Sequence, residues 1–496
     1  MPFLHRLFLS LACTGALTVM VTATTVDSAI PLSLDEAIRL ALENNQSVKV
    51  SAYDPLIGRA GVLAAYGSFD PALTFARSEG ETEEPGTYIS PQTRPLTQSD
   101  NYSLTLDGLT PWGMTYSVGA TALNQRGTFN GFTDSYSTFG GISITQPLLR
   151  DFGFGSNLAG LRVARANRGI TEWQHRQTVI DTVTNVIYVF NNLQQAHDNL
   201  RIARLSRDLA ARLLDENQKR RRVGSISDAD VTQAEARVAN REEAILSAER
   251  SVRDIENQLR RLLGRTDFPT NGNDLAIVEL PPSPPITVSA IDDYRTALDI
   301  RPDYQAARLG LKIVKTNDTV ARNQLLPRVD FVGSYGHGGL DPNFRTARDQ
   351  VRDRDARAYS AGFVVRVPLA FAEGRGRARA ARLTLRQTEA DLVRLEQDIA
   401  LGVSAAAGQI ETTQHRVEVS RRALELAHQA LDAEEKRLKA GTSTTFFVLQ
   451  QQELLAQVEN SYARALADQR RALATYERET GTTLERHQIT LTDLQP

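Results

Sequence analysis

The chain has 496 residues, and its 57 basic and 59 acidic side chains give a formal net charge of −2. This balance gives no support to nucleic-acid binding, which needs a basic face. Its single cysteine, Cys13, lies in an N-terminal apolar stretch. Without that stretch the chain has no thiol, which excludes disulfides and thiolate metal sites.

Residues 1–23 are predicted to be a signal peptide. His5 and Arg6 precede an apolar run, and Val21-Thr22-Ala23 offers a small-residue cleavage site. The residues before Cys13 also loosely match a lipidation box, so a lipid anchor is the alternative. No later segment has the ~20 consecutive apolar residues that a transmembrane helix needs, so any membrane crossing would use strands.

The rest of the sequence has the same order of patterns twice. We predict a first repeat at 32–270, a proline-rich connector at 271–290, a second repeat at 291–482 and a tail at 483–496. Each repeat has an amphipathic helical opening, strands that begin after a proline, and a long charged helix that breaks at a glycine. The matching landmarks are Leu34-Asp35-Glu36-Ala37 and Ile291-Asp292-Asp293-Tyr294, Pro71 and Pro327, and Gly224 and Gly441.

Strands are predicted within 71–147 and 327–368, where apolar and polar residues alternate. One apolar face and one polar face are typical of a membrane barrel, although a soluble sandwich with one solvated face shows the same alternation. The connections favour the barrel. Polar stretches predicted as long loops (79–99, 124–135 and 337–358) contrast with a tight turn at 107–111.

The alternation predicts four strands in the first repeat and two in the second. Six strands cannot close a barrel, and a membrane tolerates no open sheet edge. Several copies of the chain are therefore expected to complete one barrel as a cyclic oligomer.

Two long helical hairpins are predicted at 156–264 and 375–480. Apolar residues recur every seven positions, as in Val403, Ile410 and Val417 and in Val186, Leu193 and Leu200. This spacing keeps one seam facing a neighbouring helix. At ~1.5 Å per residue each long helix would reach roughly 100 Å. An ordinary coiled-coil dimer is the alternative, but it leaves the strands unexplained.

In this order and spacing, the patterns resemble the TolC family of outer-membrane channel proteins, from about Leu32 to Thr482. The most specific matches are the segment from Gln146 to Gly153, the opening at Leu34, and the turn at Val223-Gly224 followed by Asp230-Val231. The resemblance implies an α+β membrane protein. Its fold would be a trimeric outer-membrane β-barrel continuous with a long periplasmic α-helical coiled-coil barrel, with internal duplication.

The implied function is that of a passive exit duct in a tripartite efflux or type I secretion system, exporting small molecules, metal ions or proteins. The implied partners are two further copies of the chain, a periplasmic adaptor, an inner-membrane pump and outer-membrane lipid. No enzymatic activity, cofactor or metal is expected, since no catalytic constellation or metal-ligand spacing occurs. The alternative is a periplasmic adaptor or scaffold protein built from helical hairpins.

The chain departs from the family by an extra hairpin, Tyr102 to Leu123. Family members usually contribute four strands per chain, which makes twelve in the trimer. With the extra hairpin this chain would contribute six, so we expect eighteen. The alternative is that this hairpin folds over the outer mouth as a cap.

The resemblance places the periplasmic entrance and the adaptor contact at the two helix breaks. The residues expected there are Val223, Gly224, Asp228, Asp230, Gly441, Thr442, Phe446, Phe447 and Gln450. Asp230 would either form a carboxylate ring in the oligomer or cap its own helix. Ser443 replaces a family arginine, and Phe447 and Gln450 replace the paired aspartates of some relatives. Phe446 or Phe447 would then narrow the entrance, or both would pack between helices.

Four aromatic residues near predicted strand ends are expected at the membrane interface, where aromatic belts meet lipid headgroups. These are Trp112, Tyr116, Tyr136 and Tyr359.

Overall fold

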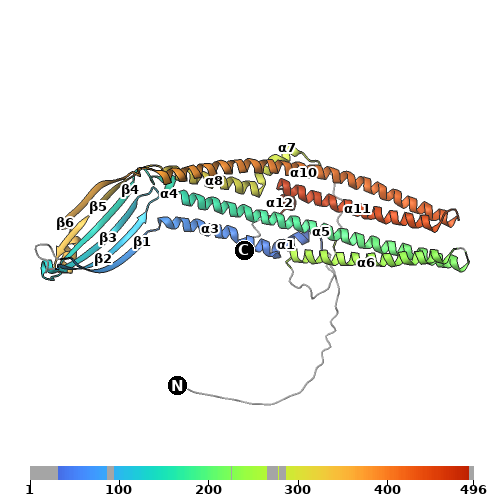
Figure 1. The fold of residues 1–496 in the computed structure, drawn as a ribbon, viewed down its shortest axis with the longest axis horizontal. Helices are drawn as coiled ribbons and strands as arrows, with labels where there is room; N and C mark the ends of the chain where they lie inside the picture. The colour runs from blue at the N-terminus through green and yellow to red at the C-terminus, as the bar shows by residue number, and fades with distance from the viewer. Residues whose placement is uncertain (1–31, 86–93, 225, 265–276, 279–285, 491–496) are drawn as a thin grey trace, which may run out of the picture.

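The computed structural model describes residues 32–85, 94–224, 226–264, 277–278 and 286–490. It is elongated, with one sheet at one end and a bundle of long helices reaching the other (Figure 1). The predicted signal peptide with Cys13, most of the predicted connector and the last residues of the predicted tail lie outside the described residues.

The described strands form one six-stranded antiparallel sheet in chain order. They are β1 (Ala72–Glu83), β2 (Leu96–Leu109), β3 (Thr115–Gly127), β4 (Tyr136–Pro147), β5 (Arg328–Asp341) and β6 (Ala356–Arg366). Four strands come from the first half and two from the second, which confirms the predicted count. The hairpin from Tyr102 to Leu123 lies within the sheet as β2 and β3, so it does not fold over the mouth as a cap.

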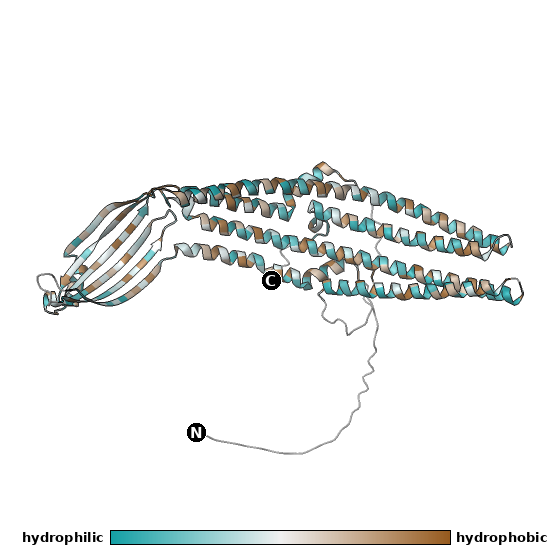
Figure 2. Cartoon of the chain, viewed as in Figure 1, coloured by the Kyte–Doolittle hydropathy of each residue, from teal (hydrophilic) through white to brown (hydrophobic). Residues whose placement is uncertain are grey.

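The register gives the sheet two different faces, because residues directly opposite one another point to the same side. Leu106, Val118, Ile142, Tyr335 and Tyr359 are paired across five strands and belong to the apolar face. The next row, Thr105, Gly119, Gly141, Gly336 and Ala358, belongs to the opposite face, called here the polar face. Figure 2 shows the alternation along the strands.

Two predicted loops are shorter than expected, and the third is wrong. β1 continues to Glu83, β2 begins at Leu96, and β3 runs to Gly127, because backbone hydrogen bonds extend a ladder through polar residues. The stretch 337–358 is not a loop: β5 continues to Asp341, the helix α9 (Phe344–Asp353) follows, and β6 begins at Ala356. The many charged residues of this stretch led to the loop prediction, although they belong to an amphipathic helix.

Two helices run almost the whole length of the helical part, α5 (Ala159–Arg222, 64 residues) and α10 (Ala372–Lys439, 68 residues). At ~1.5 Å per residue each spans roughly 100 Å. Two shorter helices accompany each one: α3 (Tyr53–Tyr66) and α6 (Asp228–Leu262) beside α5, and α8 (Pro302–Asn323) and α11 (Thr445–Thr480) beside α10. Among the described residues, none of the helices combines the length and apolar character needed to cross a membrane.

Short helices fill the middle and the junction with the sheet. They are α1 (Leu34–Asn44), α2 (Gln46–Ser51), α4 (Phe154–Asn157), α7 (Ala290–Ile300) and α12 (Thr483–Arg486), with the 3-10 turn η1 (Gly67–Phe69). A second 3-10 turn, η2 (Thr128–Asn130), joins β3 to β4 at the end of the sheet away from the helices. The helical opening of the first repeat is therefore divided into α1, α2 and α3. Asn45 interrupts it, because its side chain accepts from Ser47 N (2.8 Å) and donates to Leu262 O (2.9 Å).

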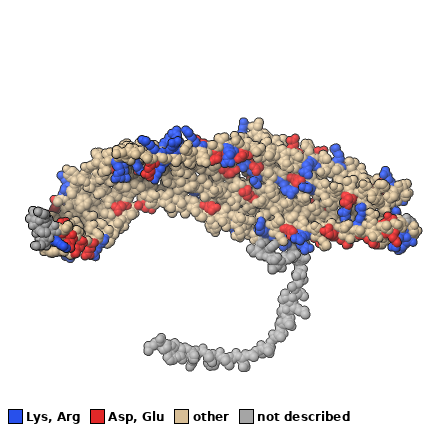
Figure 3. Space-filling model, in the orientation of Figure 1, with Lys and Arg blue, Asp and Glu red and all other residues tan. Residues whose placement is uncertain are grey.

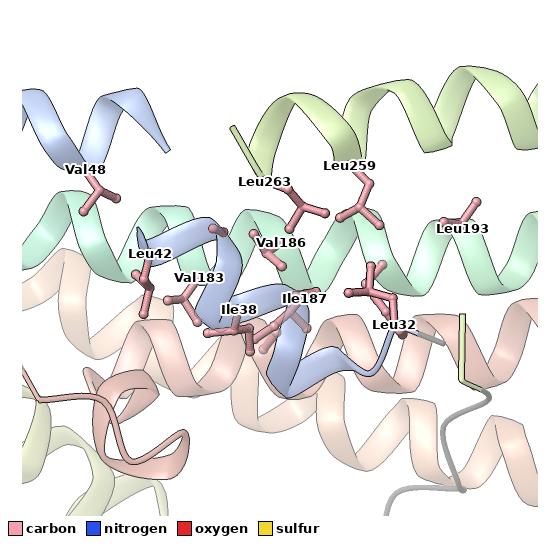
Figure 4. Close-up of a cluster of buried hydrophobic side chains, with 14 of the residues drawn as sticks. Leu32, Ile38, Leu42, Val48, Val183, Val186, Ile187, Leu193, Leu259 and Leu263 are labelled. Carbon is pink, nitrogen blue, oxygen red and sulfur yellow. The ribbon is translucent and has the colours of Figure 1, made fainter. Parts of the chain in front are cut away.

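The main apolar core lies at mid-length, where α1 and α2 pack on α5 and the end of α6 (Figure 4). Val186 and Leu193, two members of the predicted seven-residue repeat, are fully buried there. In α10, Val403 and Ile410 are also buried, so the repeat does mark a packing seam, as predicted. α12 begins the predicted tail, and its Leu484 joins the same core.

Candidate functional site

The two helix breaks lie at the end of the molecule farthest from the sheet (Figure 1). α5 turns back into α6, and α10 turns back into α11, so each break is the tip of a helical hairpin. The hairpins are joined through packing of α5 on α11 and by an ion pair between Arg241 and Glu453.

The first tip is built around Gly224, whose φ of +76° is in the left-handed region that favours glycine. Its amide donates to Arg221 O (2.9 Å), which ends α5. Val223 is 77% exposed beside it. The chain then enters α6 through an N-cap at Ser227.

Asp230 completes a capping box with Ser227. Ser227 N donates to the Asp230 carboxylate (3.1 Å), and Asp230 N donates back to Ser227 Oγ (3.3 Å). The Ser227 hydroxyl also donates to the carboxylate (2.7 Å), and these hydrogen bonds hold the pKa of Asp230 below its ordinary value. The capping role predicted as one alternative is therefore present in the single chain.

A basic run at the first tip was missed in the sequence. Lys219, Arg220, Arg221 and Arg222 are consecutive at the end of α5, where cations complement the helix dipole. Arg221 pairs with Asp228, so this exposed carboxylate is partly neutralised. A count of charge along the chain would have shown the run.

The second tip repeats the geometry with different side chains. Gly441 has a φ of +75°, and the amide of Thr442 donates to Arg437 O (3.0 Å). Ser443 donates its hydroxyl to Glu434. These residues line a depression together with Phe447.

Phe446 and Phe447 are 58% and 50% exposed, and their rings meet edge to face with centroids 5.7 Å apart. The next two residues, Val448 and Leu449, are buried instead. Within one chain the phenylalanines therefore lie outside the hairpin core. Gln450 is exposed one turn further on.

The predicted interface aromatics lie at different heights along the sheet. Trp112 is in the β2–β3 turn at the helix end, with Tyr116 just beyond it in β3. Tyr136 begins β4 at the opposite end. Tyr359 is opposite Tyr335 in the body of the sheet and is 72% exposed.

The segment from Gln146 to Gly153 joins the sheet to the helices. Asp151, with a φ of +64°, receives the Gln324 amide on its carboxylate (2.5 Å), and its own amide donates to Asn323 Oδ1 (2.8 Å). Asn157 donates to Asp151 O (2.8 Å), and Gly153 N donates to Trp112 O (3.0 Å). These hydrogen bonds make the segment a structural junction between the sheet and the helices.

No cluster of metal-ligating side chains occurs among the described residues. What the geometry provides is a sheet with an exposed apolar face, a helical column roughly 100 Å long, and two hairpin tips at its far end. These are the parts of a membrane-anchored duct.

The family comparison agrees with this class of protein. Residues 112–265 and 294–482 match the family described as outer membrane efflux protein. The match covers more than half of the chain, so the chain belongs to this family. A comparison with curated protein sequences found no match.

Several solved outer-membrane channels have a similar fold. The channel OprN has a TM-score of 0.69 at 18% identity, over 90% of each chain. CmeC of Campylobacter jejuni has a TM-score of 0.67 at 14% identity, over 91% of this chain and 86% of that one. VceC of Vibrio cholerae has a TM-score of 0.66 at 18% identity, over 90% of this chain and 96% of that one.

The protein is therefore an efflux duct of the outer membrane that extends into the periplasm, and it is a passive channel rather than an enzyme. The predicted resemblance to the TolC family is confirmed.

Proposed function

We propose that three copies of the chain close one eighteen-stranded barrel, which continues into a helical tube in the periplasm. The observation that carries this proposal is the six-stranded sheet with two unpaired edges. Every residue of β1 is exposed in the single chain, as are nearly all residues of β6. A bilayer cannot accommodate such edges, because their backbone groups would have no hydrogen-bond partner.

In this assembly the apolar face meets lipid and the polar face lines the pore. Leu73, Phe75 and Phe363 are 72%, 69% and 68% exposed on the apolar face, which suits contact with hydrocarbon. On the polar face, the hydroxyls of Ser334 and Ser360 form a hydrogen bond (2.8 Å) suited to a water-filled lumen.

The two halves are proposed to be copies of one ancestral unit. Each half contains strands, a long helix, and two shorter helices laid end to end beside it. The matching positive φ values at Gly224 and Gly441 support this duplication. The halves differ in strand number, since the first contributes one more hairpin to the sheet.

The hairpin tips are proposed to form the gated entrance and to meet a periplasmic adaptor that links the duct to an inner-membrane pump. Val223, Gly224 and Asp228 would present the first tip, and Gly441 and Thr442 the second. The exposed Phe446, Phe447 and Gln450 follow the second tip, and Asp230 follows the first. Exposure of these groups in one chain supports a role in contact with other chains.

Single-channel recording of the purified mature protein in a planar lipid bilayer tests the proposal. We expect discrete conductance steps. A closed entrance would suppress the current of the wild type, so the double variant Asp230→Ala, Phe447→Ser is recorded in parallel. Silence of both proteins, or extraction of the protein from membranes without detergent, would contradict the proposed barrel.

A further inference from the structure

The helix α9 lies against the apolar face of the sheet, at the end opposite the helical column. It packs on β5 and β4. Ala347 is fully buried, and Thr138 Oγ1 donates to Ala347 O (2.9 Å). Gly140 on β4 is paired with Ala120, and Ala120 with Leu104, so all three belong to the apolar face. Thr138 lies two residues from Gly140 and therefore points to the same face. α9 thus lies on the apolar side of the sheet.

Two glycines allow this close approach. A Cβ at Gly339 would lie 2.1 Å from Ala347 O, and one at Gly140 would lie 2.8 Å from the Val351 side chain. The side chain of Gln350 also accepts a hydrogen bond from Leu340 N (2.8 Å). The helix α9 is therefore packed tightly against the sheet as part of the barrel wall and is not a loop projecting from it.

The sequence of α9 places cations beside its apolar side. Phe344, Ala347 and Val351 share the side toward the sheet, and Arg345, Arg348 and Arg352 recur at i, i+3 and i+7 on the adjoining flank. Five arginines and three aspartates occur from Phe344 to Arg357. Arg348 and Arg352 contact Asp349, yet their side chains remain 57% and 69% exposed.

An apolar cavity of about 180 Å³ opens between α9 and the strands β1 to β4. Its lining includes Phe75, Leu104, Ala120, Phe344, Val351 and Arg348. Arg77 lies close by, over the ring of Tyr102, which also lines the cavity (5.4 Å). Figure 3 shows that charged atoms on the visible face are sparse over the middle of the sheet and gather toward its outer end.

We propose that α9 and this cavity bind a phosphorylated, acylated lipid of the outer leaflet. Arg345, Arg348 and Arg352 would hold its phosphate groups, and the cavity would receive part of one acyl chain. Guanidinium groups bind phosphate through paired hydrogen bonds, whereas an apolar cavity on a lipid-facing wall is filled by hydrocarbon. The inference rests on the lipid-facing orientation of the apolar face in the proposed function, and not on the cargo or the adaptor.

The test uses the full mature protein in detergent, with lipid A carrying two phosphates as the probe and native mass spectrometry to count bound lipid. Dephosphorylated lipid A and inorganic phosphate are the comparison ligands. We expect the phosphorylated form to bind about tenfold more tightly than the dephosphorylated form. The triple variant Arg345→Gln, Arg348→Gln, Arg352→Gln should lose this preference.

Ala120→Trp tests the cavity separately and should weaken binding of both lipid forms, because Ala120 lines the cavity and the larger side chain would fill it. The control Arg421→Gln, Arg422→Gln removes exposed arginines from the half of α10 nearer the hairpin tip, far from the sheet, and should change nothing. Preference retained in the triple variant, or full competition by inorganic phosphate, would overturn the proposal. Conductance recorded for each variant separates loss of the lipid site from failure of the channel itself.

Discussion

At the residue scale, Asp230 has an observed capping role and a proposed role in a ring of carboxylates at the entrance. Its hydrogen bonds to Ser227 explain its position without any other chain. In a trimer, three copies of the same group would nevertheless lie near the entrance and attract cations. The two roles are separable, because capping needs an acceptor oxygen whereas a carboxylate ring needs charge.

Asp230→Asn and Asp230→Ala are expected to differ for this reason. The asparagine keeps an acceptor, so amide exchange at 228–232 should stay slow, whereas the alanine should accelerate it several-fold. If the carboxylates also form a ring, both variants should lower cation selectivity in bilayer recordings. Slow exchange in the alanine variant would contradict the capping role.

The pH dependence of this cap has a definite sign. The hydrogen bonds lower the pKa of Asp230 from its ordinary value of 3.8, so its stabilising contribution is fully present above pH 3.8. The contribution is lost as pH falls through the lowered folded-state pKa. Exchange at 228–232, corrected for intrinsic rates, should therefore accelerate below about pH 4 in the wild type. The asparagine variant serves as the pH-independent control.

Phe446 and Phe447 offer a matched pair of positions, because they are adjacent and both are at least half exposed in one chain. An apolar constriction resists wetting, so replacing the lumen-facing ring with serine should raise single-channel conductance. We expect a rise from one of Phe446→Ser and Phe447→Ser, with little change from the other. Unchanged conductance in both and in the double variant would exclude a gating role.

At the scale of elements, the junction between sheet and helices depends on close backbone contacts. Gly113 has a φ of +97°, and a Cβ there would lie 2.5 Å from Asp151 O. Gly113→Ala should therefore destabilise the fold by about 1–3 kcal/mol. The control is Gly155→Ala in α4, where a Cβ meets nothing within 4 Å. Equal heat-unfolding midpoints for the two variants would argue against a strained junction.

The buried seam of α5 predicts a second contrast within one helix. Leu193 is fully buried, whereas Leu205 is 38% exposed. Leu193→Ala should cost about 2–5 kcal/mol, and Leu205→Ala less than about 1 kcal/mol. Thermal unfolding at a fixed scan rate, followed by helical circular dichroism, measures both. A similar loss at the two positions would mean that Leu205 is covered by a neighbouring chain.

Much of this organisation could be predicted, because the spacing of apolar residues and the positions of turn glycines are local properties of the sequence. Alternation gave the six strands, the seven-residue repeat gave the seam through Val186 and Leu193, and Gly224 and Gly441 gave the turns. The helix α9 was missed because only three of its ten residues are apolar. Its packing depends on Gly339 and Gly140, and only the register of the sheet brings these two glycines close to the helix. The junction contacts of Asp151 with Asn323 and Gln324 are equally non-local.

At the scale of the whole molecule, an even number of strands per chain has a geometric consequence. β1 runs away from the helices and β6 runs back toward them, so β6 of one copy meets β1 of the next in antiparallel fashion. Each seam can then continue the same hydrogen-bond pattern as the five internal pairings. Closure by three identical seams requires no strand from another protein.

Cysteine cross-linking tests that closure. Ala76 on β1 belongs to the polar face, as do Ser360 and Val364 on β6. Ala76→Cys combined with Ser360→Cys or Val364→Cys should give an oxidant-dependent, covalently closed trimer in one of the two registers. The control partner is Ser334→Cys on β5, whose neighbouring strands already occupy both of its edges. Because Cys13 lies in the predicted signal peptide, the mature chain adds no background thiol. A covalent dimer without trimer, or a cross-link to Ser334→Cys alone, would contradict a ring of three chains.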